Sequence, residues 1–349
     1  MMTKVSNGLW TNFNRKKEES SKSFSHEYAL DEEDIQQKKM TDLHRRLCHR
    51  KDPENFITLN TIHRYLQANH WNIDEAEEMI LRTLKWRIKH QPQLWQCKWC
   101  IETPGYHAWR QVGFDKTGRP VIYSCFAQEQ AKSDTIEDTI VHMVYLIENA
   151  IATMPDDNCT WIWILDCTGI TMSSTCNKLN AKVMNLLSNH YPCRLGQLLC
   201  INYNWIFSSI WSTAKLFLTP QTIAKVCLVT PAQLKPLFTD LFPINLCNWL
   251  LDEIELNKSE QLSQSQANFW VQPFRESEHD PRGCGDYITR YLFAADAAPD
   301  STVQSSNDRR IHRPHPNMCR LYNSPSSASD VNIDQITALI NRALKDIAG

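Results

Sequence analysis

Apolar runs of strand length alternate with amphipathic helical patterns between residues 121 and 229. The strand candidates are residues 121–125, 161–165, 195–201 and 226–229. Between them, apolar side chains recur at helical spacing over residues 136–154 and again over 179–187. Strands joined through a helix run parallel, because only such a crossover brings the next strand back in the same direction. The order therefore predicts an α/β fold with helices packed on a mixed or parallel sheet.

Short helical patterns precede this part of the chain. Ile62, Tyr65 and Leu66 share one helix face, and a second pattern starts at Asn72, reaches Arg87 and is ended by Pro92. We therefore expect a helical N-terminal lobe over 36–95 and an α/β domain over 96–256. The segments before and after these two lobes differ from them in amino-acid composition. We expect a disordered N-terminus over 1–35, a flexible linker over 257–330 and an amphipathic helix over 331–349.

The bulk composition limits the class of protein. A net charge of −2 argues against a globally basic nucleic-acid binder. The thirteen cysteines are odd in number, and several lie in apolar strand-like runs, where a thiol acts as a small hydrophobe. With no secretory signal in residues 1–23, we expect a reducing, cytoplasmic setting. No run reaches the roughly 18 apolar residues of a membrane span, so membrane contact should be peripheral.

A local basic cluster near the N-terminus leaves two interpretations open. It is a solvated helix face or a contact with anionic membrane. Its members are Lys38, Lys39, Arg45, Arg46, Arg50 and Lys51.

Catalytic and metal-binding motifs are weak. The chain has no P-loop, no GxGxxG fingerprint and no GxSxG elbow. Cys97 and Cys100 form a CxxC without a second pair or a suitably spaced histidine motif, so we expect surface or core thiols and no metal site. Asp166 is a catalytic carboxylate or an acceptor for backbone amides around Thr168. For His190 we favour packing or capping over catalysis. We therefore assign no catalytic residue and expect no enzymatic activity.

Residues 189–226 join a turn, a buried strand, an apolar helix and a cationic element. Large apolar side chains recur near helical spacing from Ile206 to Leu218. Arg194, Thr222 and Lys225 place charge and a hydroxyl beside this apolar helix. They are ordinary exposed polar residues, or they hold a phosphate through charge-assisted hydrogen bonds. A ligand with an apolar body and a phosphate, a lipid, fits the second interpretation.

Several separated blocks resemble one family in the right order. They are TIHRYLQANHWNIDEAEEMILRTLKWR, GFDKTGRPVIY, ILDCTGITMSS, NHYPCRLGQLLCIN and KLFLTPQTIAKV. Over about residues 55–250 the chain is similar to the CRAL-TRIO, or Sec-fourteen-like, lipid-binding proteins. The resemblance implies a helical lobe and an α/β lobe whose sheet floors a hydrophobic lipid pocket covered by a gating helix. The implied gate and pocket lining comprise Phe207, Ile210, Trp211, Phe217 and Leu218.

The resemblance also implies part of a headgroup site. Arg194, Thr222 and Lys225 match residues that phosphoinositide-binding members use. Cys193 stands where the family usually has an acid, and Asn69 aligns with a family arginine. The glycine pair that often closes the domain is missing near residues 242–245. Phosphatidylinositol is therefore the first choice of ligand, with another phospholipid, a sterol, a tocopherol or a retinoid as alternatives.

We thus expect a monomeric carrier that binds a phospholipid and transfers or presents it at a membrane surface. Its only ligand would be the lipid, with no other cofactor. A second hypothesis is a lipid-sensing regulatory or scaffold protein that binds a protein partner through its C-terminal tail. A third is an α/β enzyme that uses Asp166 and His190.

Overall fold

The computed structural model describes residues 25–95, 97, 107–128, 135–155, 158–171, 177–259 and 266. The chain divides into two compact units, residues 1–84 and 85–349. The expected linker and terminal helix over 257–330 and 331–349 lie outside the described residues, apart from residues 257–259 and 266. Among the described helices, none combines the length and apolar character that crossing a bilayer requires.

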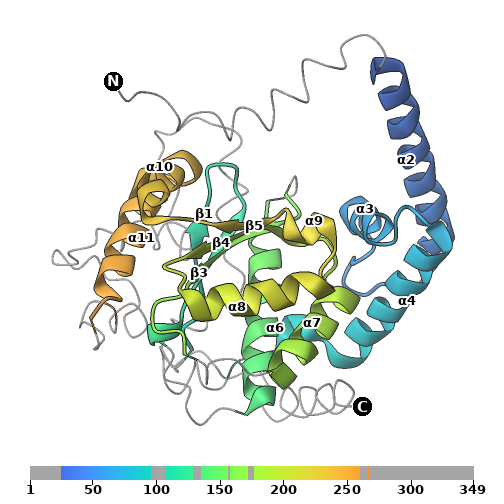
Figure 1. Ribbon diagram of the computed structural model, residues 1–349. Helices are drawn as coiled ribbons and strands as arrows, with labels where there is room; N and C mark the ends of the chain where they lie inside the picture. Colours follow the sequence, from blue (N-terminus) through green and yellow to red (C-terminus); the bar gives the residue numbers. More distant parts are fainter. Residues whose placement is uncertain are drawn as a thin grey trace, which may run out of the picture. The chain divides into compact units, whose positions relative to one another are not determined.

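The first unit consists of helices, drawn in blue in Figure 1. Helix α2 (Ser25–Leu47) begins inside the segment 1–35 that was expected to be disordered, and α3 (Leu59–Ala68) follows it. Helix α4 (Ile73–His90) starts in this unit and runs past its boundary at Leu84. The side chains that pack these helices together are Leu43, Leu47, Ile62, Tyr65, Leu66, Ala76, Met79 and Ile80. The expected shared face of α3 is confirmed.

Three members of the basic cluster have partners within this unit, among them Arg45, which pairs with Asp42. Lys39 Nζ donates to the carbonyl oxygen of Trp71 at 2.9 Å. Arg46 Nη1 lies 2.7 Å from Asp74 Oδ1 and 3.2 Å from Glu77 Oε2. The contacts of Arg46 tie α2 to α4, and the three residues together support the interpretation of a solvated, ion-paired helix face.

The second unit is built on a sheet of five strands in the order β1-β2-β3-β4-β5. The strands are β1 (Arg110–Phe114), β2 (Pro120–Cys125), β3 (Trp161–Asp166), β4 (Leu195–Ile201) and β5 (Val226–Leu228). Strands β1 and β2 are antiparallel, and every later neighbour is parallel. The predicted α/β fold with a mixed sheet is confirmed. Strand β1 was not predicted. A turn at residues 115–118 connects it to its antiparallel neighbour β2.

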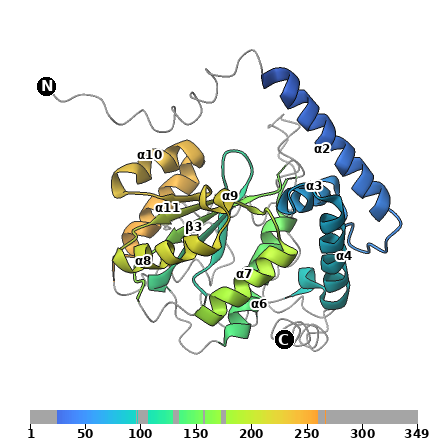
Figure 2. The same cartoon turned by 45° about the vertical axis from the view of Figure 1, so that its right-hand side comes forward.

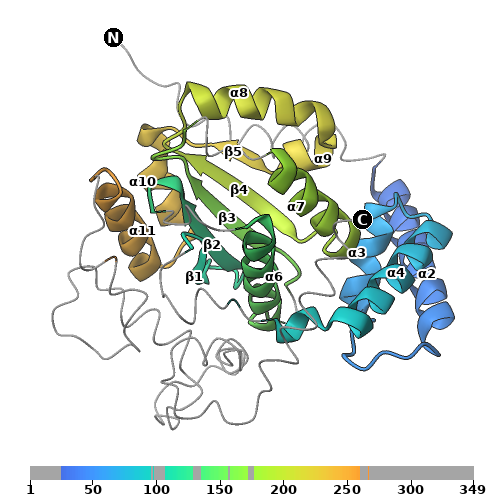
Figure 3. The ribbon, with the colours of Figure 1, turned by 90° about the horizontal axis from the view of Figure 1, so that it is seen from below.

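Helices cover both faces of this sheet, which is why β3 reads as a continuous apolar run. Trp161 and Trp163 point toward α6 (Ile136–Ala152) and α7 (Asn177–His190), which lie side by side in Figure 2 and Figure 3. Ile162 and Ile164 point to the opposite face, against α10 (Pro231–Leu241) and α11 (Ile244–Leu256). The two predicted crossover helices are thereby confirmed.

The turn after β3 is held by the carboxylate of Asp166, which is fully buried. Asp166 Oδ1 accepts from the backbone N–H of Thr168 at 3.0 Å and from its hydroxyl at 2.7 Å. Asp166 Oδ2 accepts from the hydroxyl of Tyr123 at 2.9 Å. Burial, and after it the Asp166 charge, raise the pKa of Tyr123 well above its ordinary value. The expected role of Asp166 as an acceptor for backbone amides is confirmed.

Gly169 in this turn is a sensitive position. Its φ is +80°, and a Cβ there would lie 2.8 Å from both the backbone nitrogen and the Cα of Ala127. We expect Gly169→Ala to lower the free energy of unfolding by roughly 2–5 kcal/mol, because about 1–2 kcal/mol of left-handed backbone strain adds to a similar overpacking cost. Urea unfolding followed by fluorescence measures this change.

Gly118→Ala is the matched control. Gly118 has a φ of +84°, but its added Cβ would meet only side-chain atoms of Asn158 and Pro155 at 3.2 Å. We expect it to cost about 1–2 kcal/mol, the backbone contribution alone. Equal costs at the two glycines would contradict the proposed clash with Ala127.

Candidate functional site

Helix α8 (Trp205–Ala214) lies across the carboxyl half of the parallel strands and forms the most apolar covering of the sheet. Its N-cap is Asn204, whose side-chain oxygen accepts from the backbone N–H of Phe207 at 3.1 Å. The cluster that we call the α8 layer joins this helix to the strands. It comprises Phe126, Leu165, Cys167, Ile170, Leu198, Cys200, Tyr203, Phe207, Ile210, Trp211 and Val226.

The expected gate residues divide along α8 and the short helix η4 (Lys215–Phe217) that follows it. Phe207 is buried in the α8 layer, and Ile210 and Trp211 are partly buried there. Leu218 is half-buried after η4, and the side chain of Phe217 lies outside the described part of the chain. The structure therefore brings three of the five residues together against the sheet.

Two further apolar residues of this segment point outward. Trp205 is 73% exposed and Leu216 is 79% exposed. They are the two most exposed large apolar side chains among the described residues. The predicted apolar pattern from Ile206 to Leu218 contained Leu216 but not Trp205, and it could not distinguish the inward face from the outward one.

The hydroxyl groups of α8 bond to the helix itself. Ser208, Ser212 and Thr213 each donate to the backbone carbonyl four residues earlier, at 3.0, 2.8 and 3.3 Å. Such bonds occupy the hydroxyl donor without any partner from outside the helix.

Thr222 and Lys225 flank the start of β5. Helix α9 (Pro220–Ile223) is capped by Thr219, whose Oγ1 accepts from the backbone N–H of Thr222 at 3.2 Å and lies 3.0 Å from Thr222 Oγ1. The Lys225 carbonyl accepts from the N–H of Leu198 at 2.9 Å, so the sheet fixes the backbone of Lys225. Within the described residues, no carboxylate pairs with the Lys225 ammonium group. A cation held in this way is suited to an anionic ligand.

Arg194 lies at the same end of the sheet, just before β4. Because Leu198 is level with Val226, the Arg194 backbone is displaced from that of Lys225 by three residues, or about 10 Å along the strands. Arg194 Nη1 donates to the carbonyl of Cys159 at 3.1 Å and lies 3.6 Å from Met154 Sδ. The Arg194 side chain thus has polar contacts within the protein.

The turn that carries Arg194 is anchored by a buried ion pair. Arg87 Nη1 and Nη2 lie 2.7 and 3.0 Å from the two carboxylate oxygens of Glu148. The Tyr191 hydroxyl donates to Glu148 Oε1 at 2.6 Å. Burial by itself raises the pKa of Glu148, but the Arg87 guanidinium and then the Tyr191 hydroxyl hold it below its ordinary value of 4.5. A charged carboxylate therefore fixes the position of the turn.

This ion pair was not predicted, although signals for it existed. Arg87 falls on the apolar face of its helical pattern, and Glu148 interrupts the apolar helix 136–154. A charged residue on a buried face usually has a charged partner. The partners are 61 residues apart, so no local spacing identifies them.

The departures from the family pattern have local structural roles. Cys193 has a φ of +55°, the left-handed region, within the turn that leads to Arg194. Asn69 ends α3 and donates from its side chain to the carbonyl of Tyr65 at 2.8 Å, entirely within the first unit. Phe242 is buried between α10 and α11, where the family often has a glycine pair after Leu-Pro.

The thiols of the sheet are core residues. Burial, and after it the neighbouring Cys227, raise the pKa of Cys200 to about 12. Burial likewise raises the pKa values of Cys125 and Cys167 above their ordinary range. These cysteines are therefore neutral and act as small hydrophobes, as the sequence indicated.

Asp166 and His190 do not form a catalytic pair in this structure. Asp166 is level with Ile201 at the carboxyl end of β4, whereas His190 precedes the amino end of that strand. His190 stacks on Trp86 with ring centroids 4.2 Å apart and an interplanar angle of 11°. This contact confirms packing as the role of His190.

Comparisons with known proteins agree on one family. Residues 108–246 match the CRAL/TRIO domain. The chain is 27% identical to the phosphatidylinositol/phosphatidylcholine transfer protein SFH11 of Arabidopsis thaliana over 58% of this chain and 59% of that protein. It is 31% identical to a CRAL-TRIO domain-containing protein of Schizosaccharomyces pombe over 49% of this chain and 17% of that protein. The matched part thus spans less than two thirds of either relative. The resemblance seen in the sequence is confirmed.

The crystal structure of Sfh5 is a solved structure similar to this chain. It matches with a TM-score of 0.43 and 14% identity, over 56% of this chain and 80% of that one.

Proposed function

We propose that the protein, whose residues 108–246 match the CRAL/TRIO domain, binds a phospholipid between α8 and the sheet and transfers or presents it at a membrane. Phosphatidylinositol is the first choice of ligand. The α8 layer, with the Lys225 ammonium at the amino end of the adjoining strand, is the observation that carries the proposal. The name of the similar Arabidopsis thaliana protein, a phosphatidylinositol/phosphatidylcholine transfer protein, supports it.

In this proposal α8 is the gate. Acyl chains can occupy the α8 layer only if Phe207, Ile210 and Trp211 move away from the strands. Each buried CH₂ contributes about 0.8 kcal/mol, which balances removal of the same group from a bilayer. Extraction therefore needs little net free energy, and opening of α8 determines the rate. Trp205 and Leu216 would contact the membrane while the gate is open.

The headgroup would be held by the phosphate-binding set Thr222, Lys225 and Arg194. Lys225 contributes charge, Thr222 a hydroxyl, and Arg194 would turn from the Cys159 carbonyl to the ligand. We propose that the protein acts as a monomer in the cytoplasm, with transient membrane contact and no cofactor other than the lipid. No charge pattern in the sequence points to a nucleic-acid partner.

The double variant Thr222→Ala, Lys225→Ala tests the headgroup site. Hydrogen bonds to charged groups contribute about 1.5–3 kcal/mol, so we expect at least a tenfold lower rate of phosphatidylinositol transfer between vesicles. Lys235→Ala is the matched control, because Lys235 is an exposed lysine of α10 away from the α8 layer.

Two results separate the parts of the proposal. Unchanged transfer in the double variant would contradict the headgroup site but not the lipid pocket. Native mass spectrometry of the wild-type chain after exposure to phospholipid vesicles should show one bound lipid. If it showed none, the proposed function itself would be wrong.

A further inference from the structure

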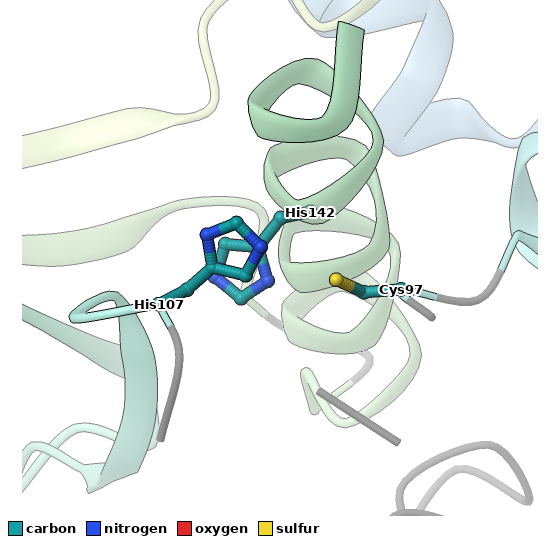
Figure 4. Close-up of side chains that lie close together, drawn as sticks. All are labelled: Cys97, His107 and His142. Carbon is teal, nitrogen blue, oxygen red and sulfur yellow. The ribbon is translucent and has the colours of Figure 1, made fainter. Parts of the chain in front are cut away.

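Cys97, His107 and His142 come together in the interior of the second unit, away from the α8 layer. They belong to three separate segments: the chain after the short helix η1 (Pro92–Leu94), the chain before β1, and helix α6. One potential ligand atom from each side chain lies within 4.8 Å of the other two. The three residues are 1%, 4% and 3% exposed. Figure 4 shows the Cys97 sulfur directed toward the two imidazole rings.

From this cluster we infer that the protein binds one zinc ion through the thiolate of Cys97 and the imidazoles of His107 and His142. Thiolate sulfur and imidazole nitrogen are the ligands that Zn²⁺ prefers in proteins. Three protein ligands leave the fourth tetrahedral position to a water molecule. The site is independent of the proposed lipid function.

His142 is already oriented as a ligand. Its Nε2 lies 3.0 Å from the carbonyl oxygen of Trp109. A carbonyl only accepts, so Nε2 carries the proton and Nδ1 carries the lone pair. Histidines that bind metals almost always donate from their second nitrogen to such a group, which fixes both the tautomer and the ring orientation.

The three segments are fixed by the surrounding core. Trp95, two residues before Cys97, is buried, and its indole N–H donates to the carbonyl of His90 at 2.9 Å. Trp109, two residues after His107, packs in a T-shaped contact with Trp163 of β3. The ligand atoms therefore lie near one another because the fold holds them there.

Binding requires two adjustments. Tetrahedral bonds of about 2.0–2.3 Å place ligand atoms about 3.3–3.6 Å apart, so separations of up to 4.8 Å must shorten by at most about 1.5 Å. The rings of His107 and His142 are stacked at 4.0 Å and 13°, so one of them must rotate to direct its lone pair at the metal. Zinc would replace the thiol proton of Cys97, which is released to solvent.

The test uses the untagged full-length chain and the metals alone. We expect one zinc per chain by elemental analysis after dialysis against Zn²⁺. Co²⁺ should give the thiolate-to-metal charge-transfer band and the strong visible bands of a tetrahedral site. In Cys97→Ser the charge-transfer band should disappear and zinc affinity should fall at least a hundredfold. The matched control is Cys159→Ser, which changes a half-buried cysteine of the same unit that is not part of this cluster.

A second measurement needs no variant. Binding to the folded state alone raises the melting temperature, so zinc should increase the Tm of the wild-type chain and a chelator should reverse the increase. Failure of the wild type to bind Zn²⁺ or Co²⁺ would overturn the inference. So would binding that persists unchanged in Cys97→Ser.

Discussion

Replacing Arg110 with methionine is expected to lower the free energy of unfolding of the unit formed by residues 85–349 by about 3–5 kcal/mol. Arg110 Nη2 lies 2.5 Å from Glu253 Oε1, and Nη1 lies 2.6 Å from Gln128 Oε1. The Arg110 and Glu253 side chains are 3% and 0% exposed. The substitution would leave a buried carboxylate without its cation, and water cannot replace the lost partner.

The guanidinium of Arg110 also contacts two aromatic rings. It lies 5.3 Å from the ring centre of Tyr123 and 5.4 Å from that of Trp249. These contacts join β1 and β2 to helix α11, so the effect should extend to the packing of α11. Urea unfolding of the full chain, followed by tryptophan fluorescence, measures the change because Trp249 belongs to this cluster.

Two further variants sharpen this experiment. Lys182→Met removes the partner of Glu137, but those side chains are 28% and 42% exposed, so the cost should not exceed about 1 kcal/mol. Arg110→Met combined with Glu253→Gln should recover part of the loss, because no buried charge then stays unpaired. If Arg110→Met cost no more than Lys182→Met, the buried pair would contribute nothing beyond a surface pair.

The second large effect is expected at Arg87. Arg87→Met should also cost about 3–5 kcal/mol, because Glu148 would keep the hydrogen bond from the Tyr191 hydroxyl but lose the cation that contacts both of its carboxylate oxygens in the core. We further expect lipid transfer to fall, since the turn that carries Arg194 is held by this carboxylate. Denaturant unfolding and vesicle transfer, measured on the same samples, check both expectations.

The same pair makes a pH-dependent contribution to stability. The pKa of Glu148 is lower in the folded chain than its ordinary value of 4.5, so the unfolded chain takes up the proton first as the pH falls. The stabilisation is therefore complete above about pH 4.5 and is lost as the pH falls through the folded-state pKa. The double variant Arg87→Met, Glu148→Gln should lose less stability over this acid range. Identical acid dependence of the two chains would contradict this role of Glu148.

Much of the fold could be predicted because it depends on local patterns. Residues 195–201 were predicted as a strand and form β4 with the same limits. Strand β1 was missed because it contains Arg110 and Gln111, two polar residues in a fully buried strand. Gln111 is satisfied by Thr153 at 3.0 Å and by Asn149 at 2.7 Å. Such partners become visible only after the chain has folded.

The start of α2 was also missed, but there the reason is a lack of apolar residues and not the presence of buried polar ones. Its charged first half offers no apolar periodicity, and the buried side chains Leu43 and Leu47 lie near its end. A helix that packs only through its last turns gives little signal at its beginning.

The candidate sites also divide into residues that the sequence could identify and residues that it could not. Arg194, Thr222 and Lys225 were identified from their place beside an apolar helical pattern and from their match to family blocks, and their role as a headgroup site stays a prediction. The Arg110–Glu253 pair joins residues 143 positions apart, and His142 lies far along the chain from Cys97. Motif spacing cannot detect side chains that only tertiary structure brings together.

The internal hydrogen bonds of α8 affect the free energy that this helix needs to move out of water. The segment Trp205–Ala214 carries no charged side chain, and three of its four hydroxyls already donate to backbone carbonyls of the helix or of its N-cap. Transfer of a polar group to an apolar medium is costly mainly when its hydrogen bonds with water are not replaced. Helix α8 keeps these bonds when it moves. In the proposed gating motion, it could therefore pass from water into the lipid headgroup layer with a small dehydration penalty.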